Sequence, residues 1–137
     1  MTQDFICGED YKPLVPNRKY EAVCTDYDQS FVMGKFRKLF LHFKITENGE
    51  HYGKSVFMAF NMPYNRKIKQ GSKYYKTYVF ANGNQRPTRN SMMSPRIFKG
   101  RVFQIKTRTV EPKFPNGKSM PRQFHYSVVD SITDVHT

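Results

Sequence analysis

The sequence predicts a mainly β domain of five strands, with one helix between the third and the fourth strand. Short stretches rich in Val, Ile, Phe, Tyr and Thr recur along the chain, and several alternate apolar with polar residues as half-buried strands do. Asn-Gly pairs and other Gly- or Pro-containing segments separate these stretches. One stretch instead has a Ser before it and a Gly just past its end, which predicts the helix.

Residues 1–18 are expected to form an extended arm ahead of the domain. The segment "KPLVPNRK" contains two prolines and little periodicity, which is typical of an extended chain. The predicted domain therefore covers residues 19–137. A chain of 137 residues is long enough for one domain with a real core.

The second predicted strand, residues 36–46, has two contrasting faces. It follows a first strand at 20–27 and a loop at 28–35, in which Gly34 turns the chain. Alternation directs one apolar set toward the core, while the opposite set places an aromatic ring among Lys and His side chains. The apolar set is Leu39, Leu41, Phe43 and Ile45, and the opposite set is Lys38, Phe40, His42 and Lys44.

The third predicted strand, residues 53–61, follows a tight Asn-Gly turn at residues 47–50. Its alternation leaves two arrangements open, because both of its faces carry large apolar side chains. The core set is either Val56, Met58 and Phe60 or the opposite set of Phe57, Ala59 and Asn61. In the first arrangement, Phe57 joins Phe40 on the outer face of the sheet.

The helix is expected at residues 73–81, with Ser72 as its N-cap and Gly83 just past its end. The Lys and Tyr residues of this segment are more typical of a barrel plug with a wet basic side than of a ligand site. We therefore do not predict that its tyrosines contact a ligand.

Two further strands, at residues 96–110 and 124–132, are joined by a long loop. Five strands with a helix between the third and the fourth is the order of an OB-fold, so we predict a five-stranded OB-fold barrel. Gly34 and Gly100 suit the strong coiling of strands in a small barrel, with Gly100 marking a bulge or kink. In OB-folds, the loops between strands one and two and between strands four and five flank the ligand groove.

The charge distribution predicts a polyanionic partner. The formal net charge is +12, and no Asp or Glu occurs from residue 51 to residue 110, a window that holds 13 Lys or Arg residues. A solvated surface usually mixes both signs of charge, so a window of one sign this long is better explained as a binding surface. Nucleic acid and an anionic membrane surface are the two candidate partners on charge alone.

The residue types disfavour catalysis, and we predict no enzyme, metal or cofactor. A two-metal nuclease needs clustered carboxylates, which the central window lacks. The four His and two Cys form no metal-binding spacing, and no nucleophile-elbow or phosphate-loop motif occurs. His42 and His125 could be imagined as a nuclease pair, but both suit strands beside a basic groove.

The two cysteines, Cys7 and Cys24, and the absence of a signal-peptide pattern indicate a reducing cytoplasm. No run approaches transmembrane length, so we expect no membrane insertion.

Single-stranded nucleic acid explains a ring among cations, because it presents base faces for stacking and phosphates for pairing. Phe40 could instead pack under a loop or a dimer partner, and Phe114 could act as a hydrophobic clip for its own loop. The predicted stacking residues are Phe40, His42, Phe57 and Phe114. The predicted phosphate contacts are Lys35, Arg37, Lys38, Arg101, Lys106, Arg108, Lys113 and Arg122.

Three segments carry a resemblance to a known family: "RKYEAVCTDY", "KLFLHFKITENGEHYGKSVFMAFN" and "RIFKGRVFQIKTRTVEP". Together they resemble the OB-fold single-stranded-DNA-binding proteins of bacteriophages and mobile elements, over roughly residues 19–132. The resemblance implies sequence-tolerant binding of single-stranded DNA in replication or recombination, in the cytoplasm of a bacterial cell or phage-infected host, and is compatible with a homo-oligomer. The chain departs from bacterial housekeeping relatives in ending "DSITDVHT", without their acidic tail and terminal Phe.

Three alternatives remain open at the level of sequence. An RNA-binding module of the same fold would use the same stacking and phosphate contacts. A basic structural or interaction protein would bind an acidic protein partner. A small nuclease would cleave DNA in the presence of Mg²⁺.

Overall fold

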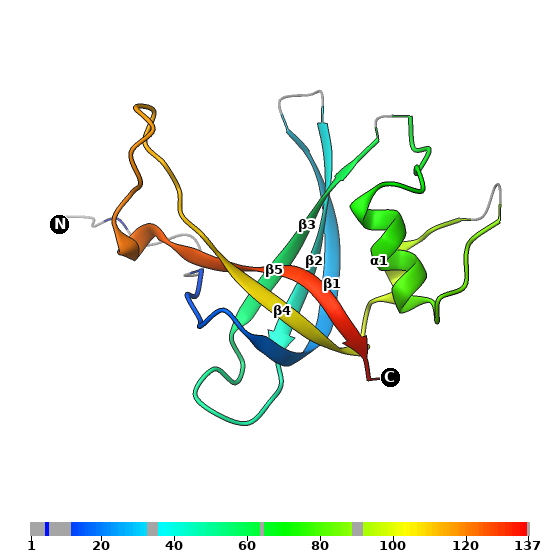
Figure 1. Ribbon diagram of the computed structural model, residues 1–137, viewed down its shortest axis with the longest axis horizontal. Helices are drawn as coiled ribbons and strands as arrows, with labels where there is room; N and C mark the ends of the chain where they lie inside the picture. The colour runs from blue at the N-terminus through cyan, green and yellow to red at the C-terminus, as the bar shows by residue number, and fades with distance from the viewer. Residues whose placement is uncertain (1–4, 6–11, 33–35, 64, 89–91, 137) are drawn as a thin grey trace.

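The computed structural model describes residues 5, 12–32, 36–63, 65–88 and 92–136. Five strands form one antiparallel sheet, and one helix lies between the third and fourth strands in sequence, which confirms the predicted mainly β class (Figure 1). The sheet order is β3-β2-β1-β4-β5. The elements are β1 (Lys19–Val32), β2 (Phe36–Ile45), β3 (Ser55–Met62), α1 (Lys73–Ala81), η1 (Pro95–Ile97), β4 (Val102–Val110), η2 (Arg122–Phe124) and β5 (Tyr126–Val135).

The sheet is not closed into a barrel. Its two edge strands, β3 and β5, approach each other, but among the described residues no hydrogen-bonded ladder joins them. The approach follows from the twist of the sheet, which is helped by an irregularity in β1 between Cys24 and Asp26. The closed barrel expected from the sequence is therefore not observed, although the strands that would close it are neighbours.

The hairpin of β1 and β2 is longer than the sequence predicted. Residues 28–32 were expected in a loop, but they continue β1 and pair with β2 as far as Val32 and Phe36. The polar stretch "DQS" was misleading, because an exposed strand position accepts polar residues when its backbone is paired. Gly34, predicted as the turning point, lies outside the described residues.

The register between β2 and β3 decides which face of β3 is buried. Three pairs of opposite residues place the apolar set of β2 against one set of β3: Phe43 and Val56, Leu41 and Met58, Leu39 and Phe60. All six side chains are at most 3 % exposed. Each burial of this kind contributes about 1.5–3 kcal/mol, so this face anchors the core. Phe57 and Ala59 consequently lie on the outer face with Phe40.

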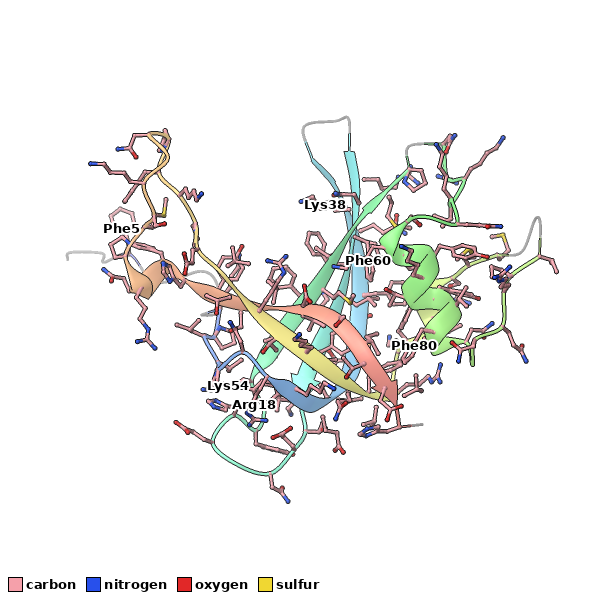
Figure 2. The ribbon with its side chains drawn as sticks, viewed as in Figure 1. Phe5, Arg18, Lys38, Lys54, Phe60 and Phe80 are labelled. Carbon is pink, nitrogen blue, oxygen red and sulfur yellow. The ribbon has the colours of Figure 1, made fainter. Side chains whose placement is uncertain are left out.

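The helix α1 covers one side of the core (Figure 1). It spans residues 73–81 as predicted, and the Ser72 hydroxyl accepts a hydrogen bond from the Tyr75 amide at 3.2 Å. The Tyr74 ring is 1 % exposed and meets the Phe60 ring edge-on at 5.4 Å. Figure 2 labels Phe60 close to the helix. Burial also raises the pKa of the Tyr74 hydroxyl, which donates to the Met93 carbonyl at 2.6 Å. The helix tyrosines Tyr74 and Tyr78 are thus core residues.

The fourth strand begins later than predicted. Residues 96–101 were expected in the strand, but Pro95–Ile97 form the short helical turn η1, because Ser94 caps it and proline suits its first position. Gly100 follows with a φ of +80°, a turn conformation that glycine adopts without strain, so it precedes β4 and does not kink it. The fifth strand is likewise shifted, from the expected 124–132 to Tyr126–Val135.

The described part of the N-terminal arm is held against β5. Val15 is 3 % exposed, and its amide donates to the Ser127 hydroxyl at 2.9 Å. The Ser127 amide in turn donates to the Pro13 carbonyl at 2.9 Å, and the Ser127 hydroxyl donates to the Val15 carbonyl at 3.1 Å. Through Val15, this part of the arm belongs to the core of the domain.

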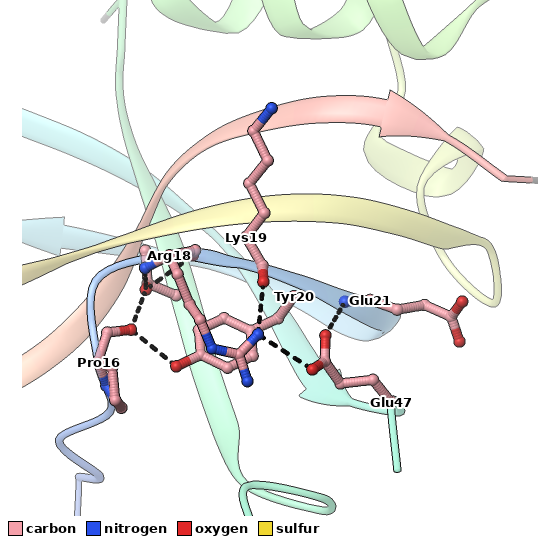
Figure 3. A network of polar contacts seen from close by, with 7 residues as sticks. Pro16, Arg18, Lys19, Tyr20, Glu21 and Glu47 are labelled. Carbon is pink, nitrogen blue, oxygen red and sulfur yellow. Dashed lines mark hydrogen bonds and ion pairs between the residues drawn. The ribbon is translucent and has the colours of Figure 1, made fainter. Parts of the chain in front are cut away.

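A second set of contacts ties the end of the arm to β1 (Figure 3). The Tyr20 hydroxyl donates to the Pro16 carbonyl at 2.7 Å. The Arg18 guanidinium lies 3.9 Å from the centre of the Tyr20 ring and pairs with Glu47 at 3.0 Å. The other Glu47 oxygen accepts from the Glu21 amide at 3.0 Å. Residues 13–18 are therefore fixed at both ends.

Candidate functional site

A cleft of about 330 Å³ opens where the outer face of β2 and β3 meets the adjoining ends of β4 and β5. The approach of β3 and β5 brings these two faces together, although the residues concerned are far apart in sequence. The cleft combines aromatic, apolar and cationic side chains. Its lining consists of Lys12, Lys38, Phe40, Phe57, Ala59, Lys73, Arg108, Val110, Tyr126, Val128 and Val129.

Three rings from three different strands form the aromatic part of the lining, here called the aromatic cluster: Phe40, Phe57 and Tyr126. Phe57 lies near-parallel to Tyr126, with an interplanar angle of 27° and 6.3 Å between ring centres. Phe40 meets Phe57 edge-on at 5.7 Å. All three rings are only partly buried, so each presents surface to the cleft. The cluster can therefore offer flat apolar faces to a planar ligand.

Four cations line the cleft together with these rings and are here called the cleft cations: Lys12, Lys38, Lys73 and Arg108. They come from four separate segments, namely the arm, β2, the first residue of α1, and β4. Figure 2 shows the position of Lys38 on its strand. A site with this many cations favours a ligand that carries several negative charges.

Among the described residues, one acid forms an ion pair with a cleft cation. Asp130 on β5 pairs with Arg108 at 3.3 Å, and both side chains are about half exposed, so the pair is weak. The pKa of Lys73 is lowered, mainly by partial burial and secondarily by the charge of Arg108, while Asp130 acts in the opposite direction. An anion bound between Lys73 and Arg108 would favour the charged form of the lysine.

His42, predicted to stack, lies on the same face but outside the lining of the cleft. It stands opposite Phe57 in the β2–β3 register, and its Nε2 lies 2.7 Å from a carboxylate oxygen of Asp28 on β1. This contact holds the imidazole toward β1. A ligand that leaves the cleft along β2 would meet His42 next.

Three predicted phosphate contacts lie away from the cleft: Arg37, Arg101 and Lys106. Arg37 alternates with Lys38 and so belongs to the face of Leu39, opposite the cleft. Arg101 precedes β4, and its guanidinium donates to the carbonyls of Ala81 at 2.9 Å and Ile97 at 3.2 Å, near the end of α1.

Lys106 is exposed on β4 and opposite Lys19 of β1, beyond the cleft lining. Lys35 lies outside the described residues.

The loop between β4 and β5 carries Lys113, Phe114 and Arg122, and it projects from the body of the molecule (Figure 1). Its two arms are joined by a bridge between Lys113 and Ser119, and the Phe114 side chain is 42 % exposed. The loop leaves the sheet just after Val110 and returns just before Tyr126, two residues that line the cleft. Its cations and ring therefore continue outward from the cleft, and their binding roles stay predictions.

Among the aromatic and cationic residues of the cleft, sequence reasoning missed three: Lys12, Lys73 and Tyr126. A signal for Tyr126 exists in the alternation of the fifth strand, where Tyr126, Val128 and Asp130 share one face. Lys12 and Lys73 give no such signal, because the fold alone brings the arm and the start of α1 to the same cleft.

The described residues show few features that favour other kinds of site. Among them, no three His, Cys, Asp or Glu side chains lie close enough to hold a metal ion. Burial raises the pKa of the Cys24 thiol to about 12, which suits a structural rather than a reactive cysteine. No helix in the described ranges is long and apolar enough to span a membrane.

Comparison of the sequence with models of known protein families and with curated proteins found no match.

Proposed function

We propose that this protein binds single-stranded DNA with little sequence preference, through the aromatic cluster and the cleft cations, in support of replication or recombination. The observation that carries the proposal is the composition of the cleft: three partly exposed rings with four cations around them. A single strand exposes both base faces and phosphates, and it is the ligand whose two parts match these two kinds of side chain. A duplex hides its base faces.

The polar groups of the cleft support sequence tolerance. Apart from the Tyr126 hydroxyl, the polar side chains that the described residues contribute to the lining are the four cations, which suit phosphate oxygens. The other side chains are apolar and make contacts that every base can accept. Sequence-tolerant single-strand binders typically use stacking and ionic contacts. They do not depend on amide or carboxylate groups that hydrogen-bond to base edges.

The topology supports an OB-fold whose barrel is open between β3 and β5. Strand β1 pairs with both β2 and β4, while β3 pairs with β2 and β5 pairs with β4. Closing the seam between β3 and β5 would complete a five-stranded barrel of this type. The cleft lies over that seam, with the hairpin of β1 and β2 and the loop between β4 and β5 beside it, where OB-folds bind oligonucleotides.

The test is fluorescence anisotropy with three labelled probes of equal length, an oligo-dT strand, a DNA duplex and an oligo-rU strand, each at two salt concentrations. Oligo-dT should bind more tightly than the duplex at both, and affinity should fall as salt rises. The footprint should be about 4–16 nucleotides per domain. Equal affinity for oligo-dT and duplex would contradict the proposal.

The same assay separates the alternatives. Preference for oligo-rU would identify an RNA-binding module, and competition by polyglutamate as strong as by oligo-dT would identify an acidic protein partner. Loss of intact probe on addition of Mg²⁺ would identify a nuclease.

A further inference from the structure

Lys12 occupies a position that the proposed function does not explain by itself. Its ammonium nitrogen lies 4.7 Å from the centre of the Tyr126 ring and 5.7 Å from the centre of the Phe57 ring. Both distances are within the range of cation–π attraction. The ammonium therefore covers ring surface that a stacked base would need.

The rest of the arm holds Lys12 at this place. Pro13, the next residue, accepts a hydrogen bond from Ser127, and Val15 is buried and bonded to the same Ser127. Ser127 directly follows Tyr126 in β5, so the anchor of the arm and one of the covered rings are adjacent. The anchored backbone thus holds the lysine side chain near the rings, while Lys12 itself is exposed to solvent.

We propose that Lys12 is a displaceable cap on the rings of Phe57 and Tyr126, which makes the cleft selective for bases carried on a phosphate backbone. This inference rests on the proposed function. A base that stacks on these rings must first displace the ammonium, which costs its attraction to both rings. A phosphate next to that base offers the displaced ammonium a new partner, whereas an uncharged ligand offers none.

The experiment compares wild type with Lys12→Met on two probes: an oligo-dT strand, and a thymine strand of the same length on an uncharged peptide backbone. The methionine variant should bind the uncharged strand about two- to fivefold more tightly, which is the loss of one exposed cation–π contact expressed as affinity. It should bind oligo-dT more weakly at low salt, with a salt slope shallower by about 0.7. The Lys12→Met substitution should therefore raise the affinity for the uncharged strand and lower the affinity for oligo-dT.

Two further variants control for charge and position. Lys12→Arg keeps a cation over the rings and should therefore show no gain on the uncharged strand, because its guanidinium also covers them. Lys19→Met removes an exposed lysine outside the cleft and should leave binding of the uncharged strand unaffected. A thermal melt checks the fold, with Lys12→Gln as the replacement if the methionine variant melts early.

The outcomes separate the two proposals. If wild type fails to bind oligo-dT, the proposed function is wrong. If wild type binds oligo-dT but Lys12→Met shows no higher affinity for the uncharged strand, the proposal that Lys12 caps the rings is wrong and the proposed function stands. The same conclusion follows if neither protein binds the uncharged strand.

Discussion

Both faces of the β2–β3 pair carry phenylalanine rings, but the two faces differ in what surrounds those rings. On the inner face, Phe43 is 0 % exposed and meets Phe103 edge-on at 6.2 Å within the core. On the outer face, Phe40 meets Phe57 in similar edge-on geometry at 5.7 Å, but both rings open onto a cleft lined by cations. Ring contact alone therefore does not separate a structural from a binding phenylalanine.

The difference lies in what surrounds each ring pair. The inner rings are enclosed by other apolar side chains, so their burial contributes to the stability of the fold. The outer rings keep exposed surface and have ammonium and guanidinium groups as neighbours, which would weaken a core but suits a ligand with charges and flat faces. The comparison predicts that mutations on the two faces alter different measurements.

The largest expected effect is on the inner face. Phe43→Ala should reduce the free energy of unfolding by about 3–5 kcal/mol, because it leaves a cavity among side chains that cannot fully collapse. Denaturant unfolding of the variant measures this loss. A loss below about 1 kcal/mol would show that the inner face is not the core.

On the outer face, Phe40→Ala should weaken binding of oligo-dT by about 1–3 kcal/mol, the usual value for one base stacked on a ring. Its salt slope should stay close to wild type, since a stacking contact releases no counterion. A salt titration of affinity measures both quantities.

Unfolding of the same variant provides the control for Phe40. We expect a loss of about 1 kcal/mol, mainly the edge-on contact with Phe57. A large loss of stability with normal binding by the refolded protein would make Phe40 a structural residue and remove the contrast between the faces.

The inner face was predictable from the sequence, whereas the cleft was only half predictable. Strict alternation in β2 identified Leu39, Leu41 and Phe43 as core, and a Ser cap identified the start of α1. These are local signals, in which the residue and its consequence lie within a few positions.

The assignment of β3 needed its register against β2, because both faces of β3 are apolar enough to be buried.

The placements that the sequence pattern did not predict depend on contacts between distant segments. Lys12 reaches the rings only because Val15 docks on β5, and Tyr126 joins Phe57 only because β3 and β5 approach each other. Arg101 carries the same charge as Arg108, and its attachment to the end of α1 is set by the turn before β4, which the sequence pattern had extended into the strand.

The smallest expected effect distinguishes these two arginines. Arg108 lines the cleft, so Arg108→Ala should make the salt slope of oligo-dT binding shallower by about 0.7, as expected for one lost phosphate contact on a single strand. Arg101 donates to two carbonyls near the helix end, so Arg101→Ala should lower the free energy of unfolding by about 1 kcal/mol and leave the slope unchanged. Salt titrations and unfolding curves on both variants make a matched pair. If Arg101→Ala changes the slope as much as Arg108→Ala, the strand contacts the end of α1 as well, and the binding surface extends beyond the cleft. If neither variant changes the salt slope, Arg108 does not contact phosphate. The outer face would then lack the binding role that distinguishes it from the inner face.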